Sequence, residues 1–180
     1  MHANNITVLP LIQSNDLVKY FRNDSQFVAT IFGEDGNPVG AGENVTFNIN
    51  GVFYTRQTNE SGQVKLNINL MQGNYTITTI YKECMVANQI EVLPILYAED
   101  LIMDQGTSDQ FRARLVDGQG NPYPGQNITF NINGLFYQRT TDADGWGALN
   151  IKLSAAANTY YVTSMYGGCI ISNKIIIKPA

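Results

Sequence analysis

The chain has 180 residues, 44% of them hydrophobic and 14% charged, and its formal net charge is −4 at pH 7. Its 11 lysines and arginines form no basic stripe, which argues against a nucleic-acid partner. No run of about 18 apolar residues occurs, so we expect no membrane contact within this segment. If the parent protein is exported, its signal peptide and anchor are expected outside the segment.

Two copies of one unit occupy most of the chain. The string VTFNINGVFY at 45–54 returns as ITFNINGLFY at 128–137. The strings ITVLP, IEVLP and IIIKP end at Pro10, Pro94 and Pro179, which sets a repeat of about 84 residues. A repeat of this length is long enough to close its own core, so the sequence indicates an array of similar domains.

The repeat period divides the chain into three parts. We predict the chain start and the tail of a preceding repeat at 1–10, a first repeat at 11–94 and a second repeat at 95–180. The junction at 92–96 is short and apolar, which favours a stiff joint over a flexible linker.

Alternation of apolar and polar residues predicts short strands that each bury one face. In the first repeat we expect strands at 16–21, 26–32, 63–70, 74–81 and 84–92, and a hairpin at 44–58. The second repeat follows the same order from 100 to 177. About seven strands per repeat without any helical period favour an all-β fold of two tandem immunoglobulin-like β-sandwich domains.

Particular residues carry this prediction. The core-facing positions are expected to be Val45, Phe47, Ile49, Val64, Leu66 and Ile68. Asn50-Gly51 and Asn133-Gly134 suit type I′ hairpin turns, because Asn and Gly tolerate positive φ. Tyr75, two residues after Gly73, is placed like the tyrosine of a tyrosine corner, and Tyr160 is its match in the second repeat.

The string NGVFYTRQTNESGQVKLNINLMQGNYTITTIY, followed by ANQIEVLP, resembles the Ig-like repeats of adhesin-like surface proteins of methanogenic archaea. The resemblance covers both repeats almost completely. It implies a stalk or adhesion module on the outside of a cell envelope, and it supplies no catalytic residue and no cofactor.

We therefore expect a non-catalytic, extracellular adhesin-like segment. The sequence contains no nucleophile elbow, no phosphate-binding loop and no His-centred triad. Expected partners are adjacent repeats of the same chain and a protein or glycan on a host or microbial surface. The alternative is a carbohydrate-binding module pair that recognises a cell-wall or host glycan. A third possibility is a self-association module, in which edge strands or cysteines join neighbouring arrays side by side.

Cys84 and Cys169 occupy equivalent places in the two repeats. A disulfide requires Cα atoms within about 7 Å, so we expect two reduced thiols within one chain, with intermolecular pairing as the alternative. The sequence has no CxxC motif and a single histidine, His2, so no zinc site is expected.

The sequence offers residues for two further kinds of chemistry, a covalent crosslink and a calcium site. Lys19 and Asn88 could form a covalent crosslink, but no acid is expected nearby, so an ordinary exposed lysine is favoured. Asp142 and Asp144 are weak candidates for calcium, which usually takes six or more oxygen ligands. Because the first repeat has Asn and Ser in these two places, we expect a plain turn and no metal.

The aromatic residues are the remaining candidates for binding. Trp146, Tyr137 and Tyr54 are candidates for glycan contact, since an exposed ring offers a flat apolar surface, but core packing or a contact between domains is favoured for them. One residue of each Phe-Tyr pair is expected to face the core and the other to face out.

Six sequons would accept N-glycans if the parent protein is exported. They lie at Asn5, Asn23, Asn44, Asn59, Asn74 and Asn127.

Overall fold

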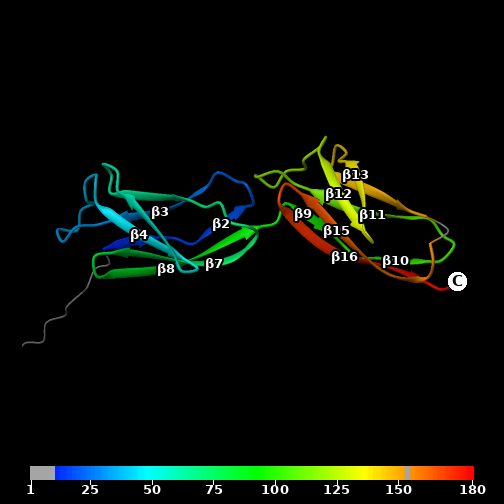
Figure 1. Cartoon of the computed structure of the whole chain (residues 1–180). Coiled ribbons are helices and arrows are strands. Elements are labelled where there is room, and N and C mark those ends of the chain that lie inside the picture. Colours follow the sequence, from blue (N-terminus) through cyan, green and yellow to red (C-terminus); the bar gives the residue numbers. More distant parts are fainter. Residues whose placement is uncertain (1–10, 153–154) are drawn as a thin grey trace, which may run out of the picture. The chain divides into compact units, whose positions relative to one another are not determined.

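The computed structural model describes residues 11–152 and 155–180, and every regular element in these ranges is a strand. The first repeat contains β1 (Ile12–Ser14), β2 (Leu17–Tyr20), β3 (Gln26–Ile31), β4 (Asn44–Ile49), β5 (Val52–Gln57), β6 (Gln63–Asn67), β7 (Gly73–Tyr81) and β8 (Cys84–Leu93) (Figure 1). The second contains β9 (Leu96–Ala98), β10 (Leu101–Asp104), β11 (Asp109–Leu115), β12 (Asn127–Ile132), β13 (Leu135–Thr140), β14 (Trp146–Ile151), β15 (Asn158–Tyr166) and β16 (Cys169–Lys178). The predicted all-β fold is confirmed. The short strands β1 and β9 were missed, so the described part of each repeat holds eight strands where about seven were expected.

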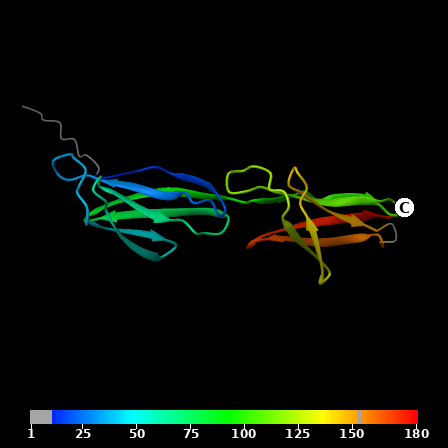
Figure 2. The ribbon, with the colours of Figure 1, turned by 90° about the horizontal axis from the view of Figure 1, so that it is seen from above.

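The chain divides into two compact units. The first comprises the described residues through Lys19 together with Asp24–Val92, and the second comprises Tyr20–Asn23 and Leu93–Ala180. Each unit has a small sheet and a large one, in the orders β1-β3-β6 and β2-β8-β7-β4-β5, and β9-β11-β14 and β10-β16-β15-β12-β13. The antiparallel pairs β7–β8 and β15–β16 contain the longest strands of their units and can be followed in Figure 2. Each unit is an immunoglobulin-like β-sandwich.

The two sheets of each unit enclose a separate apolar core. In the first unit Phe27 of the small sheet meets Phe47 of the large sheet edge to face, with ring centroids 5.9 Å apart. Phe111 and Phe130 repeat this contact in the second unit at 5.8 Å. The predicted core positions are all buried: Val45, Phe47, Ile49, Val64, Leu66 and Ile68. Alternation along β4 and β6 thus identified the buried face correctly.

The predicted turns and tyrosine corners are also present. Asn50 and Asn133 have φ of 51° and 52°, and each is followed by a glycine with φ of 80°, as a type I′ turn requires. The hydroxyl of Tyr75 donates to the carbonyl of Met71 at 2.8 Å. The hydroxyl of Tyr160 donates to the carbonyl of Ala156 at 2.9 Å, so both repeats contain the corner.

A carboxylate before the second strand of each repeat ties the chain to the last strand. Asp16 Oδ1 accepts hydrogen bonds from the backbone N–H of Gln89 at 2.9 Å and from the side chain of Asn88 at 3.1 Å. Asp100 Oδ1 accepts equivalent bonds in the second repeat, led by the N–H of Lys174 at 2.9 Å. These backbone and side-chain bonds hold the pKa of both carboxyl groups below the ordinary aspartate value.

This lowering predicts a specific acid sensitivity. A depressed folded-state pKa contributes stability that is present above the unfolded pKa and is lost as pH falls through the folded value, so the loss occurs below about pH 4. We expect the Asp16→Asn/Asp100→Asn variant, which keeps an oxygen acceptor at each position, to show a flatter decline of Tm between pH 4 and pH 2. Circular-dichroism melts across this range test the prediction. An unchanged decline would assign the acid sensitivity to other carboxylates.

Candidate functional site

The outer face of the small sheet in the second unit carries two aromatic rings and two guanidinium groups. In the strand register Arg114 of β11 lies opposite Tyr97 of β9 and opposite Trp146 of β14. Arg112 lies two residues before Arg114, on the same face of β11. We name Tyr97, Arg112, Arg114 and Trp146 the aromatic–arginine face; they line a cavity of about 730 Å³.

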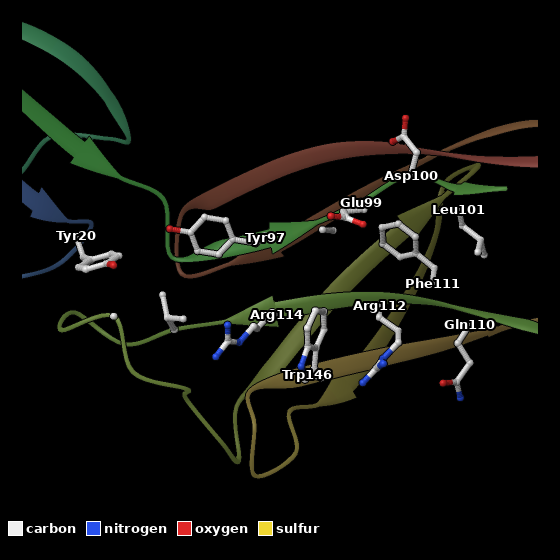
Figure 3. A pocket seen from close by; sticks show the side chains of 13 residues that line it. Tyr20, Tyr97, Glu99, Asp100, Leu101, Gln110, Phe111, Arg112, Arg114 and Trp146 are labelled. Carbon is white, nitrogen blue, oxygen red and sulfur yellow. The ribbon is translucent and has the colours of Figure 1, made fainter.

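The guanidinium group of Arg112 covers the indole ring of Trp146. Its Cζ atom lies 4.7 Å from the ring centroid, which is within the range of a cation–π contact. Figure 3 shows the indole between the side chains of Arg112 and Arg114. A sugar ring could stack on the face under Arg112 only after displacing that side chain. The ring is half-buried and one of its faces is paired with Arg112, and glycan contact at Trp146 stays a prediction.

Hydrogen bonds to Asp142 hold the turn that precedes Trp146. The backbone N–H of Trp146 donates to Asp142 Oδ1 at 3.0 Å, and this bond is the main reason that the pKa of Asp142 lies below its ordinary value. The N–H of Asp144 donates to the same oxygen at 2.9 Å, and the positive charge of Arg112 lowers the pKa further. Burial raises the pKa of Tyr97 above the ordinary tyrosine value.

The first unit lacks this face although it has the same scaffold. The equivalent cross-strand row is Gln13, Thr30 and Gln63, which contains neither a ring nor a charge. The next polar pair along the sheet is kept: Gln110 donates to Asn150 at 2.7 Å, as Gln26 does to Asn67 in the first unit. The two repeats therefore share the framework and differ in this row. A comparison of the two copies along the predicted strands could have revealed Arg114 and Trp146, but not Tyr97, whose strand β9 was not predicted.

The turn that holds Asp142 and Asp144 serves the same purpose in both repeats. Asn59 Oδ1 in the first unit accepts from the N–H groups of Ser61 and Gln63, each at 3.0 Å, as Asp142 does two and four residues on. This is the turn role that the sequence predicted. Within residues 11–152 and 155–180, no group of three or more His, Cys, Asp or Glu side chains could hold a metal ion.

The two rings of each hairpin Phe-Tyr pair differ in exposure. Tyr54 and Tyr137 are half-buried on the core side of their edge strands, and an arginine, Arg56 or Arg139, lies 6.0 Å from each ring. The exposed rings are their neighbours Phe53 and Phe136, at 62% and 65%. Tyr161, at 63%, is a further exposed ring that the sequence reasoning missed. The tyrosine of each pair does face inward and the phenylalanine outward, but the tyrosines chosen for glycan contact are the more covered rings.

Lys19 contradicts the expectation of an exposed lysine. Its side chain is only 5% exposed, and its Nζ donates to the carbonyl of Ile68 at 2.6 Å. Desolvation lowers the pKa of this amine. The side-chain amide of Asn88 donates instead to Asp16. Lys19 and Asn88 are thus engaged in separate hydrogen bonds, an arrangement that gives no support to a crosslink.

Neither cysteine takes part in a disulfide. Cys169 is buried and Cys84 is half-buried.

The sequons differ in exposure. Asn5 lies outside the described residues, and Asn23 is half-buried. The other four are exposed: Asn44, Asn59, Asn74 and Asn127. Their occupancy remains a prediction.

No protein-family model matches the chain, and no curated protein is similar to it in sequence. Among solved structures it is similar to the I9–I11 tandem of titin, with 13% identity and a TM-score of 0.45 over 94% of this chain and 66% of that one. It is also similar to the Yersinia pseudotuberculosis adhesin InvE, with 13% identity and a TM-score of 0.36 over 92% and 57% of the two chains. Invasin, a bacterial integrin-binding protein, has 17% identity and a TM-score of 0.39 over 97% and 40%. The chain spans two thirds or less of each of these structures. At such identities and scores the likeness carries no functional argument, and the immunoglobulin-like arrangement rests on the strand order of each unit.

Proposed function

We propose that this chain is a non-catalytic pair of repeats from an adhesin-like protein, exported and displayed on a cell surface. The resemblance of the repeat sequence to the Ig-like repeats of adhesin-like surface proteins of methanogenic archaea supports this assignment. The duplication of one sandwich, with a boundary near Pro94, supports it as well. In this function the repeats act as stalk and presentation modules, and a binding region is added to one of them.

The observation that carries the proposal is the difference between the two copies. The first unit presents only polar side chains in the row Gln13, Thr30 and Gln63, whereas the second presents Tyr97, Arg114 and Trp146. Tyrosine, tryptophan and arginine are the residue types that dominate protein-binding hot spots. Stacking on Trp146 also restrains the Arg112 guanidinium, which reduces the entropy lost when it binds. These features favour a protein on a host or microbial surface as the partner.

Carbohydrate recognition is the second candidate. It is favoured by the exposed rings of Phe136 and Tyr161 on the large sheet of the second unit, because exposed rings can stack on sugars. This reading places the glycan away from Trp146, whose ring is paired with Arg112.

An exchange of the row between repeats tests the proposal. Beads coated with the whole chain would be scored for adhesion to fixed cells and for binding on an array of host and microbial glycans. We expect the Tyr97→Gln/Arg114→Thr/Trp146→Gln variant, which copies the first repeat's row, to reduce cell adhesion at least tenfold and to leave the glycan signal unchanged.

Two matched variants complete the design. Gln13→Tyr/Thr30→Arg/Gln63→Trp transfers the row to the first repeat and should increase adhesion. Phe136→Thr/Tyr161→Thr removes the exposed rings and should leave adhesion unchanged. Adhesion that survives the row exchange but is lost with the exposed rings would replace the protein-binding proposal with the carbohydrate one. Loss in neither variant would contradict both sites.

A further inference from the structure

A groove opens along one side of each sandwich, between two strands that end their sheets. In the second unit β13 ends the large sheet and β14 ends the small one. The groove between them has a volume of about 440 Å³ and an apolar lining that includes Leu149, Ile151 and Ile177, with Tyr137 and Tyr160 beside them. The first unit has a smaller version of about 240 Å³ at the same place, with Leu66 and Ile68 in its floor. We name the larger one the edge groove.

The charge of the edge groove is opposite to that of the chain. Among the residues that the structure describes, its lining contains Arg139 and Lys152 and no carboxylate, although the chain as a whole carries a net charge of −4. The groove of the first unit likewise contains Arg56 and no acid. Two cations over an apolar floor suit a ligand that has both carboxylates and apolar groups.

The backbone of β13 offers a free hydrogen-bonding edge along this groove. The two-residue turn makes Ile132 and Leu135 a hydrogen-bonded pair, so alternate residues of β13 turn their N–H and C=O groups away from β12. These residues are Phe136, Gln138 and Thr140. An edge of this kind is a template for one more strand.

An arginine side chain covers part of that edge in both repeats. Arg139 Nη1 donates to the carbonyl of Gln138 at 2.8 Å, and Arg56 Nη1 donates to the carbonyl of Thr55 at 2.9 Å. The guanidinium of Arg139 therefore protects an outward carbonyl while no strand is present. A ligand carboxylate that pairs with Arg139 would draw the side chain off this carbonyl and free it for a backbone partner.

We propose that the edge groove binds an extended acidic peptide as an added strand on β13. The peptide backbone pairs with Phe136, Gln138 and Thr140, its apolar side chains enter the groove, and its carboxylates meet Arg139 and Lys152. A peptide is favoured over an acidic glycan because the polar groups best placed for regular pairing are the outward N–H and C=O groups of the β13 edge. This inference is independent of the aromatic–arginine face.

The test is a titration of the ¹⁵N-labelled whole chain with the acetylated and amidated hexapeptide TVEVEV. We expect saturable shifts of the Phe136, Gln138 and Thr140 amide signals, and an affinity for the lysine peptide TVKVKV at least tenfold weaker. The Arg139→Gln/Lys152→Gln variant should weaken TVEVEV binding at least tenfold. Absence of saturable shifts, or equal binding of the two peptides, would overturn the proposal.

A proline variant separates strand addition from simple charge attraction. Gln138→Pro removes an outward N–H but leaves both cations in place, and proline is tolerated on edge strands. We expect it to abolish TVEVEV binding, while Thr55→Pro, the equivalent change in the first unit, leaves the signals of β13 responsive. Melting curves would confirm that both variants are folded. If a hexauronate binds as tightly as TVEVEV and Gln138→Pro changes neither affinity, the site is a polyanion site and the peptide assignment fails.

Discussion

The Gly145→Ala variant is expected to lower the free energy of unfolding of the second unit by about 3–4 kcal/mol. Gly145 has φ of +83°, and a Cβ atom added there would lie 2.4 Å from the carbonyl oxygen of Leu115 and 3.1 Å from the backbone nitrogen of Tyr123. Both obstacles are backbone atoms, so no side-chain rotation relieves them. The N–H of Leu115 also donates to the Gly145 carbonyl at 2.7 Å, and this bond holds the turn against β11.

A second glycine provides the matched control. Gly134 has φ of +80°, but nothing lies within 4 Å of the Cβ that alanine would add. Gly134→Ala should therefore lose only about 1–2 kcal/mol, from the left-handed backbone conformation alone. Urea denaturation followed by the fluorescence of Trp146, the chain's single tryptophan, reports on the second unit. Equal losses in the two variants would show that backbone strain, and not the close approach to Leu115, determines the cost.

Replacing Lys19 with methionine should raise the stability of the first unit. The amine is buried with one described hydrogen bond, to the carbonyl of Ile68, and the second repeat has Met103 at this place, also buried. Exchange of a buried charge for an apolar side chain of similar size stabilises proteins by up to a few kcal/mol, and we expect about 1–2 kcal/mol at pH 7. The reverse change, Met103→Lys, should cost about 3 kcal/mol or more.

The stability difference between the wild type and Lys19→Met should depend on pH. Desolvation lowers the pKa of Lys19 in the folded state, so above that pKa the unfolded chain binds more protons than the folded one. Wild-type stability then rises with pH until the unfolded lysine titrates near pH 10.4. The advantage of Lys19→Met should therefore be full at neutral pH and smaller at pH 10.

Hydrogen exchange of buried β7 and β8 amides, such as those of Ile77 and Ile90, measures the first unit by itself. Lys65→Met, at an exposed position, serves as the control and should change little. An advantage for Lys19→Met that stays constant from pH 7 to pH 10 would mean that the buried amine is not destabilising.

The candidate site could be predicted only in part. Trp146 was selected from the sequence, but its partners Arg112, Arg114 and Tyr97 were not, because they come from two other strands. The sequence could not show that Arg112 lies over one face of this ring. In the same way the sequence indicated that one ring of each Phe-Tyr pair faces inward and the other outward. It did not show that Tyr54 and Tyr137 are the inward rings, beside arginines, and that Phe53 and Phe136 are exposed.

Local signals were sufficient for the strands other than β1 and β9, for the predicted turns, and for the buried faces of β4 and β6. An alternating pattern shows which residues share a face of a strand. An Asn-Gly pair indicates a type I′ turn, and a tyrosine two residues after the turn glycine indicates a tyrosine corner. Whether a face is covered depends on the strand opposite it, which is distant in sequence. Only the tertiary structure could therefore bring the Lys19 amine to the carbonyl of Ile68 and the backbone of Leu115 against Gly145. It also leaves β13 and β14 as the open edges of a groove.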